Sequence, residues 1–170
     1  HPLLGCMRTP ENNRGIPDGM PWAADCGLKV AISTDSSEVD RYFAWLDGLE
    51  RAGNLFAVTP DVLGDAEACW RRSAPLLPKI RALGYQAAFV AQDGFDPEQV
   101  DWDAFDCLFI GGRPNNPRGL PPNERKRLAC LEWKRSEIGG YAAIRAAHAR
   151  GIPTHVGRVN GGPFLRNLAA

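Results

Sequence analysis

The sequence predicts a parallel α/β fold. Short apolar segments suited to buried strands alternate along the chain with longer segments whose apolar residues recur at helical spacing. The strand candidates are apolar on both faces, which is typical of parallel strands covered by helices. The chain has 170 residues, of which 44% are hydrophobic and 24% charged, and this is enough for one domain with a sizeable core. We therefore expect a single domain over residues 1–170.

The individual elements follow from local signals. Residues 1–21 are rich in proline and glycine and predict irregular structure. Asp65 is the expected N-cap of a helix that Pro75 and Pro78 should kink or split. Strands are expected around Trp22 and over 55–59, 87–91, 107–110 and 154–156; helices over 35–53, 65–84, 97–105 and 136–150, with a last helix beginning at Pro163. These make about five βα units, whereas a closed barrel needs eight.

A stretch rich in proline and arginine, residues 113–131, departs from this alternation. We interpret it as an inserted loop after a strand, because long loops in compact domains are often functional or disordered. Its basic residues include Arg118, Arg125, Lys126 and Arg127. Lys and Arg together number 20, as do Asp and Glu, so any contact with nucleic acid must depend on such a local patch. A solvated loop explains the same charges equally well.

The cysteines and the hydropathy pattern predict a cytoplasmic protein without a membrane segment. The chain has five widely spaced cysteines, with no C-x-x-C pair and no Cys/His cluster at zinc spacing. We expect reduced thiols, several of them buried, and neither a metal nor another cofactor. No apolar run approaches the roughly 20 residues that span a bilayer.

Polar and glycine residues follow the predicted strands, at the edge where parallel α/β proteins bind ligands. Two carboxylates, one amide and an exposed glycine backbone could together bind the hydrogen-bonding edge of a purine. Ordinary turn chemistry also explains each residue taken singly. The candidates are Asp25, Asp61, Gln92, Gly111 and Gly112.

A second candidate site follows the last predicted strand. Asn160, Gly161 and Gly162 precede Pro163 and could present free N–H groups to a phosphate at a helix N-terminus, with Arg158 adding a charge. A glycine turn into a helix would look the same. A single histidine within a strand is usually structural, so His155 is not counted among the candidate ligands.

Several strand-end motifs, taken in order, resemble the DNA-deazaguanine transglycosylases, relatives of the queuine and archaeosine tRNA-guanine transglycosylases. The motifs are GCMRTP (5–10), PWAADCG (21–27), FAVTPDVLGDA (56–66), AFVAQDG (88–94), FDCLFIGG (105–112), EWK (132–134) and HVGRVN (155–160). The resemblance covers nearly the whole chain. It implies an incomplete TIM-type barrel that replaces guanine in DNA, or in tRNA, with a 7-deazaguanine base such as preQ0.

The resemblance also implies roles for the strand-end residues. Asp25 would be the general acid/base near the scissile glycosidic bond. Asp61 would recognise the base, and Gln92 and Gly111 would hold its polar edge. The family reaction passes through a covalent intermediate on an aspartate, and two displacements then retain the configuration at the sugar.

The sequence departs from the family at several points. The motif D-N-G-x-F is replaced by Asp25-Cys26-Gly27-Leu28-Lys29, and the loop 113–131 is longer than expected. The residues up to Ala170 include neither the family's nucleophilic aspartate nor its zinc motif. Three hypotheses therefore stay open. The chain is an enzyme that exchanges guanine, or a fragment of one. Alternatively, it is a truncated, non-catalytic relative that binds base or nucleic acid, or that pairs with itself or a partner chain. The third hypothesis is an unrelated α/β enzyme for a small phosphorylated metabolite.

Overall fold

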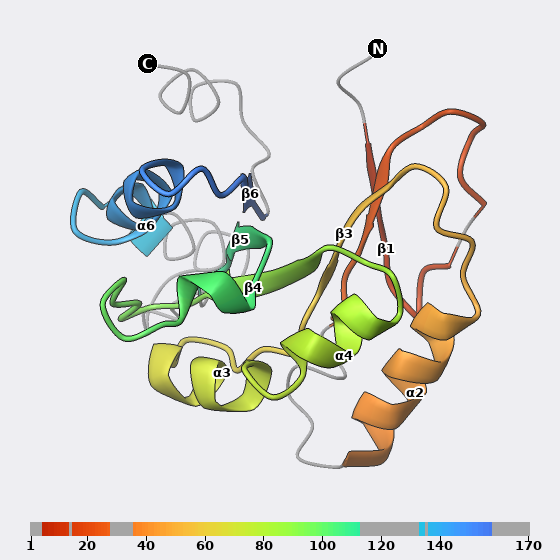
Figure 1. Cartoon of the computed structure of the whole chain (residues 1–170), viewed down its shortest axis with the longest axis horizontal. Coiled ribbons are helices and arrows are strands. Elements are labelled where there is room, and N and C mark those ends of the chain that lie inside the picture. Colours follow the sequence, from red (N-terminus) through yellow and green to blue (C-terminus); the bar gives the residue numbers. More distant parts are fainter. Residues whose placement is uncertain (1–4, 14, 28–35, 113–132, 135, 158–170) are drawn as a thin grey trace, which may run out of the picture.

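The chain folds into an open sheet of parallel strands with helices packed against it (Figure 1). The computed structural model describes residues 5–13, 15–27, 36–112, 133–134 and 136–157. Within them the sheet has six strands in the order β1-β2-β3-β4-β5-β6, and each neighbouring pair is parallel. The strands are β1 (Cys6–Arg8), β2 (Trp22–Ala24), β3 (Asn54–Val58), β4 (Ala87–Ala91), β5 (Cys107–Ile110) and β6 (Thr154–Val156). The helices are α2 (Ser36–Asp47), α3 (Ala66–Ser73), α4 (Leu77–Ala82), the 3₁₀ turn η1 (Trp102–Ala104) and α6 (Gly140–His148).

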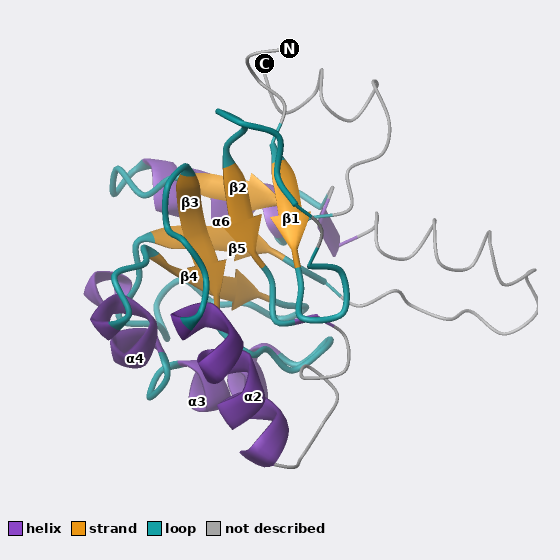
Figure 2. Cartoon of the chain, turned by 90° about the vertical axis from the view of Figure 1, so that its right-hand side faces the viewer, coloured by secondary structure: helices purple, strands orange, loops and turns teal. Residues whose placement is uncertain are grey.

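The sheet curls into a half-barrel (Figure 2). Neighbouring strands lie about 4.8 Å apart, so β3 and β6 would be separated by roughly 14 Å in a flat sheet. The ring centroids of Phe56 on β3 and His155 on β6 are nevertheless only 5.4 Å apart. Phe109 of β5 contacts both rings, at 6.4 Å from Phe56 and 4.9 Å from His155. Side chains from strands that are not neighbours therefore meet on the concave face.

The helices cover the outer face of the sheet and complete its core. α3 and α4 contact β4, and α6 contacts β5 and β6. The hydroxyl of Tyr42, on α2, donates to the carbonyl oxygen of Val58 at 2.6 Å, and that of Tyr85 donates to the carbonyl oxygen of Leu46 at 2.8 Å. These buried hydrogen bonds fix α2 against the sheet, because a buried hydroxyl without a partner would be costly.

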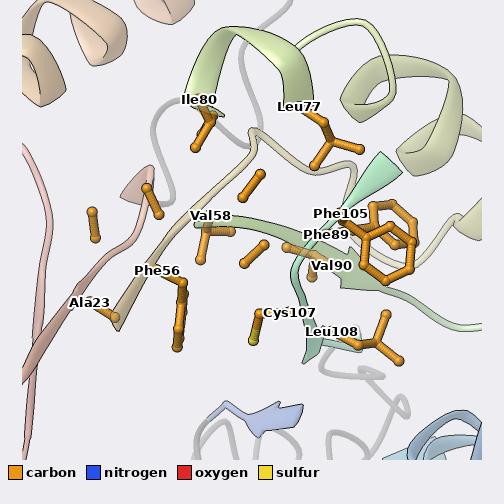
Figure 3. Packing of buried hydrophobic residues seen from close by; sticks show 14 of the residues in the cluster. Ala23, Phe56, Val58, Leu77, Ile80, Phe89, Val90, Phe105, Cys107 and Leu108 are labelled. Atoms are coloured by element: carbon orange, nitrogen blue, oxygen red, sulfur yellow. The ribbon is translucent and has the colours of Figure 1, made fainter. Parts of the chain in front are cut away.

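The hydrophobic core lies between the sheet and these helices (Figure 3). Leu77 and Ile80 of α4 are fully buried, and all five residues of β4 are buried. Phe89 of β4 packs against Trp70 of α3 and against Phe105, with ring centroids 5.1 and 5.5 Å apart. A strand buried on both faces explains why this segment is apolar throughout.

The parallel α/β class and most of the predicted elements are confirmed. The carboxylate of Asp65 accepts from the backbone N–H of Ala68 at 2.9 Å, as expected of an N-cap. The predicted split near Pro75 and Pro78 also occurs, because α3 ends at Ser73 and α4 begins at Leu77. No helix of the described part of the chain is long and apolar enough to cross a membrane.

Four expectations about the fold need correction. Residues 1–21 are not wholly irregular, because Cys6–Arg8 forms β1 through pairing with β2. The described sheet therefore has six strands rather than about five, and it is open. The helical turn expected over 97–105 is limited to η1. The helix expected from Ser136 begins at Gly140, because residues 137–139 form a turn. The loop 113–131 and the helix from Pro163 lie outside the described residues.

Candidate active site

A cavity of about 220 Å³ opens at the carboxyl ends of the strands, on the concave side of the sheet. In parallel α/β proteins this is the end at which ligands bind. All five strand-end candidates lie on its wall. The lining residues are Met7, Asp25, Gly27, Val58, Asp61, Leu63, Val90, Gln92, Phe109, Gly111, Gly112, Lys134, His155 and Gly157.

Asp61 and Gln92 form the best-defined polar contact of the cavity. The Gln92 amide nitrogen donates to Oδ2 of Asp61 at 2.5 Å, and Gln92 is only 1% exposed. The amide oxygen accepts from the backbone N–H groups of Gly64 at 3.0 Å and Gly112 at 3.1 Å. These two bonds fix which end of the amide faces Asp61, because an amide turned over would place N–H groups against each other. Gln92 therefore holds Asp61 in one orientation.

The surroundings of Asp61 favour its protonated form. Asp61 is 8% exposed, and burial together with the negative charge of Asp25 raises the pKa of its carboxyl from 3.8 to about 6. Hydrogen bonds from its own backbone N–H and from Gln92, and the charge of Arg72, oppose this rise in pKa. A carboxyl group with such a pKa can both accept and donate a proton near neutral pH.

Asp25 follows β2 and supplies the second carboxylate. Its backbone N–H donates to the carbonyl oxygen of Arg8 at 2.8 Å, which joins it to β1. Its Oδ1 accepts from the backbone N–H of Gly27 at 3.1 Å. Gly27 has a φ of +77°, a conformation that suits glycine and lets the chain turn back beneath the carboxylate. A general acid/base role for Asp25 stays a prediction.

Gly111 and Gly112 leave room for the neighbouring side chains. A Cβ on Gly111 would lie 2.6 Å from Cγ1 of Val90 and 2.8 Å from the Gln92 amide nitrogen, closer than real contacts allow. Gly112 has a φ of +93° and donates to Gln92. Both glycines therefore support the orientation of Gln92, whereas the sequence predicted that they contact the ligand directly.

Sequence reasoning passed over two residues of the cavity wall. Lys134 is 3% exposed, and its ammonium donates to the carbonyl oxygen of Gly157 at 2.6 Å. His155 was set aside as structural, yet its ring forms part of the cavity. Burial lowers the pKa of the His155 imidazole. The negative charge of Asp25 raises this pKa, and the positive charge of Lys134 lowers it further. Lys134 stood out in the sequence only as part of the EWK motif, directly after Trp133, and the long loop before it concealed its spatial relation to the strand ends.

Cys26 is not a candidate nucleophile. Burial is the main cause that raises the pKa of its thiol well above its usual value, and the charges of Asp25 and Asp61 add to the effect. The thiolate is the reactive form of cysteine, so this thiol is inert at neutral pH. The four described cysteines, Cys6, Cys26, Cys69 and Cys107, form no disulfide in the described part of the chain, and their reduced state stays a prediction.

The remaining candidates lie outside the described residues. They are the proposed phosphate ligands Arg158, Asn160, Gly161 and Gly162, and the basic loop residues Arg118, Arg125, Lys126 and Arg127. Contact with DNA or tRNA, or with a partner chain, therefore stays a prediction from the sequence. Among the residues that the structure does describe, no group of three His, Cys, Asp or Glu side chains could hold a metal ion.

Together, the fold and the cavity define an α/β protein with a polar cavity at one end of a curled parallel sheet. Among curated proteins, the chain is similar to a thiopurine S-methyltransferase of Xanthobacter autotrophicus, with 28% identity over 111 residues. The match covers 65% of this chain, and it spans half the length of that relative. No family model and no solved structure matches the chain.

This comparison corrects the resemblance stated above. The named relative is a methyltransferase, which points to an enzyme but not to exchange of guanine for a deazaguanine such as preQ0. The motifs misled because short Asp-Gly and Gly-Gly turns recur after strands in parallel α/β proteins of many kinds. Their order along the chain reflects the shared alternation of strands and helices as much as descent from one family.

Proposed function

We propose that the chain forms the catalytic face of an enzyme that uses Asp61 as a general acid/base on a small polar molecule. The observation that carries this proposal is the buried Asp61 carboxyl, held by Gln92 in the cavity wall with a pKa of about 6. Carboxyl groups with pKa values near neutrality are concentrated at active sites. In its ionised form Asp61 accepts a proton from the bound molecule, and in its protonated form it returns one.

The carboxylates of Asp25 and Asp61 indicate which chemical groups the bound molecule carries. Asp25 and Asp61 both face the cavity, and ionised carboxylates only accept hydrogen bonds. Oδ1 of Asp25 and Oδ2 of Asp61 already accept bonds from the protein, and each carboxylate has a second oxygen. A group with N–H donors and positive charge, such as an ammonium or amidinium, complements this pair.

Methyl transfer is a second candidate, favoured by the similarity to the methyltransferase. Methyl transfer to a nitrogen or sulfur atom forms a bond from that atom to the methyl carbon and breaks the bond between this carbon and the donor's leaving group. The nitrogen or sulfur atom also releases a proton, which Asp61 could accept. A nucleotide-sized methyl donor does not fit the described residues. The cavity of about 220 Å³ is smaller than the roughly 300–1,000 Å³ of pockets for drug-sized ligands. The strand order also differs from the doubly wound order that binds nucleotides, so we derive no step through a donor.

The finer fold is also a proposal. Sequential parallel strands, each beside its neighbour in the chain, are the arrangement of a TIM-type barrel, and the sheet curls so that side chains of β3 and β6 meet. An experimental structure with further parallel strands beside β1 or β6 would support a barrel. A strand order that reverses beyond these edges would contradict it.

Calorimetry with four simple cations tests the function: agmatine, putrescine, histamine and benzamidine. We expect at least one to bind the wild-type chain, and its affinity to fall about tenfold or more in Asp61→Asn. Asp93→Asn is the matched control, because Asp93 follows the next strand but does not line the cavity. The affinity should also fall below about pH 6, where Asp61 becomes protonated. If none of the cations binds, or if binding does not depend on Asp61, the assignment is wrong. Binding of S-adenosylmethionine instead would favour methyl transfer.

A further inference from the structure

Lys134 is held in the cavity wall by close packing of its backbone. A Cβ on Gly140 would collide with the backbone of Lys134, and one on Gly139 would lie 2.6 Å from the carbonyl oxygen of Trp133. The two glycines at the start of α6 therefore let the Trp133–Lys134 segment approach the sheet. Lys134 is 3% exposed, so its ammonium group is a buried charge in the cavity wall.

His155 lies beside Lys134 in the same part of the cavity. Its ring packs against Phe56 and Phe109, with centroids 5.4 and 4.9 Å away. Lys134 donates to Gly157, which follows β6 directly, and its charge acts on His155. An ammonium and an imidazole, both N–H donors, therefore line the β6 side of the cavity.

The two sides of the cavity differ in charge. Asp25 and Asp61 follow β2 and β3, whereas Lys134 and His155 lie at β6, with β4 and β5 between the two groups. Across about 220 Å³, room for roughly seven water molecules, the site thus pairs acceptors on one side with donors on the other. Such a site discriminates among ligands by charge distribution, because a ligand of the wrong polarity leaves buried charges unpaired.

We propose that the cavity binds a small zwitterion of amino-acid size, with its cationic N–H group at Asp25 and Asp61 and its carboxylate at Lys134 and His155. The inference rests on the proposed function and names the substrate class of the same site. It assigns the lysine and the pair of carboxylates, which line the same cavity, to opposite charges of one ligand. It also limits the ligand to one whose two charged groups are only a few bonds apart.

Matched pairs of an amine and its amino acid test the inference by calorimetry: agmatine with arginine, putrescine with ornithine, and histamine with histidine. The members of each pair differ by one carboxylate. We expect the amino acid of the best pair to bind at least tenfold more tightly than its amine to the wild-type chain. In Lys134→Met, the ratio of the affinity for the amino acid to the affinity for the amine should fall to about one, while the affinity for the amine is kept or improved. Lys79→Met, at an exposed position on α4, should keep the wild-type ratio.

A second variant keeps the test valid if Lys134→Met does not fold. His155→Phe keeps an aromatic ring against Phe56 and Phe109 and removes the N–H groups, so it should lower the ratio several-fold. If an amine binds through Asp61 but the corresponding amino acid binds no more tightly, the proposal of a zwitterionic ligand is wrong and the proposed function stands. If wild type, Lys134→Met and His155→Phe all prefer the amino acid equally, the carboxylate of the ligand is not bound by Lys134 and His155, and this assignment is wrong. If neither member of any pair binds, the proposed function itself fails.

Discussion

At the scale of single residues, the chemistry of the cavity depends on how Asp61 is surrounded. Burial and the charge of Asp25 favour its neutral form, while Gln92 fixes its orientation through three hydrogen bonds of one amide group. The sequence predicted that these side chains meet, because each directly follows a strand. It could not predict the raised pKa, which depends on burial in three dimensions.

The raised pKa of Asp61 makes stability depend on pH in a definite direction. The folded chain holds the proton up to about pH 6, whereas the unfolded chain releases it near 3.8, so this group's contribution to stability is lost as the pH rises between these values. The difference corresponds to about 3 kcal/mol. In Asp61→Asn this loss does not occur. Relative to wild type, the free energy of unfolding of Asp61→Asn should therefore increase by about 3 kcal/mol from pH 4 to pH 7. Urea unfolding at both pH values measures it, and a pH-independent difference would contradict the assignment.

Gly111→Ala tests the packing around Gln92. The added Cβ would meet Val90 and the Gln92 amide, so we expect a loss of roughly 1–3 kcal/mol in the free energy of unfolding. Gly15→Ala is the control, because nothing lies within 4 Å of its added Cβ. Urea denaturation of both variants gives the comparison. An equal effect of the two substitutions would show that Gly111 is not constrained by Gln92.

At the scale of elements, the predictable features were those with local causes. The N-cap of α3 follows from Asp65, and the break between α3 and α4 follows from Pro75 and Pro78. β1 was missed because its residues are only half-buried and carry no apolar pattern; pairing with β2 makes it a strand. The start of α6 was misplaced because Glu137 and Ile138 continue the helical composition, although the chain turns there.

The N-cap of α3 gives a prediction at this scale. Asp65→Ala removes the acceptor of the Ala68 N–H and should cost about 1 kcal/mol of stability. Asp40→Ala, in the exposed part of α2, removes an equal charge without removing a cap and should have an effect below about 0.5 kcal/mol. Thermal unfolding of the two variants distinguishes them. Equal shifts in Tm would mean that charge rather than capping determines the result.

At the scale of the whole molecule, the curl of the sheet brings Phe56 on β3 against His155 on β6, although two strands lie between them in the sheet order. The sequence predicted parallel strands and the edge at which the site lies. The curvature of the sheet could not be predicted from the sequence, because contacts such as that between Phe56 and His155 join residues about a hundred positions apart. Lys134 entered the site for the same reason, through a fold that brings β6 and α6 back against the strand ends.

The curl predicts energetic coupling between β3 and β6. A double-mutant cycle with Phe56→Leu and His155→Leu should give a coupling energy of about 0.5–1.5 kcal/mol, as found for aromatic pairs in contact. The same cycle with Phe89→Leu in place of Phe56→Leu should give a value near zero, because Phe89 packs toward α3 instead. Additive effects of Phe56 and His155 would indicate a flatter sheet.

The pKa of Asp61 is the most direct test of the central claim, that this buried carboxyl is the acid/base of a cavity at the strand ends. It can be measured by following the ¹³C resonances of the aspartate carboxyl groups by NMR as a function of pH, with Asp61→Asn used to assign the signal. We predict a titration midpoint of about 6 for Asp61. A midpoint near the ordinary value of 3.8 would mean that Asp61 is a solvated surface acid, and the proposed catalytic role would be withdrawn.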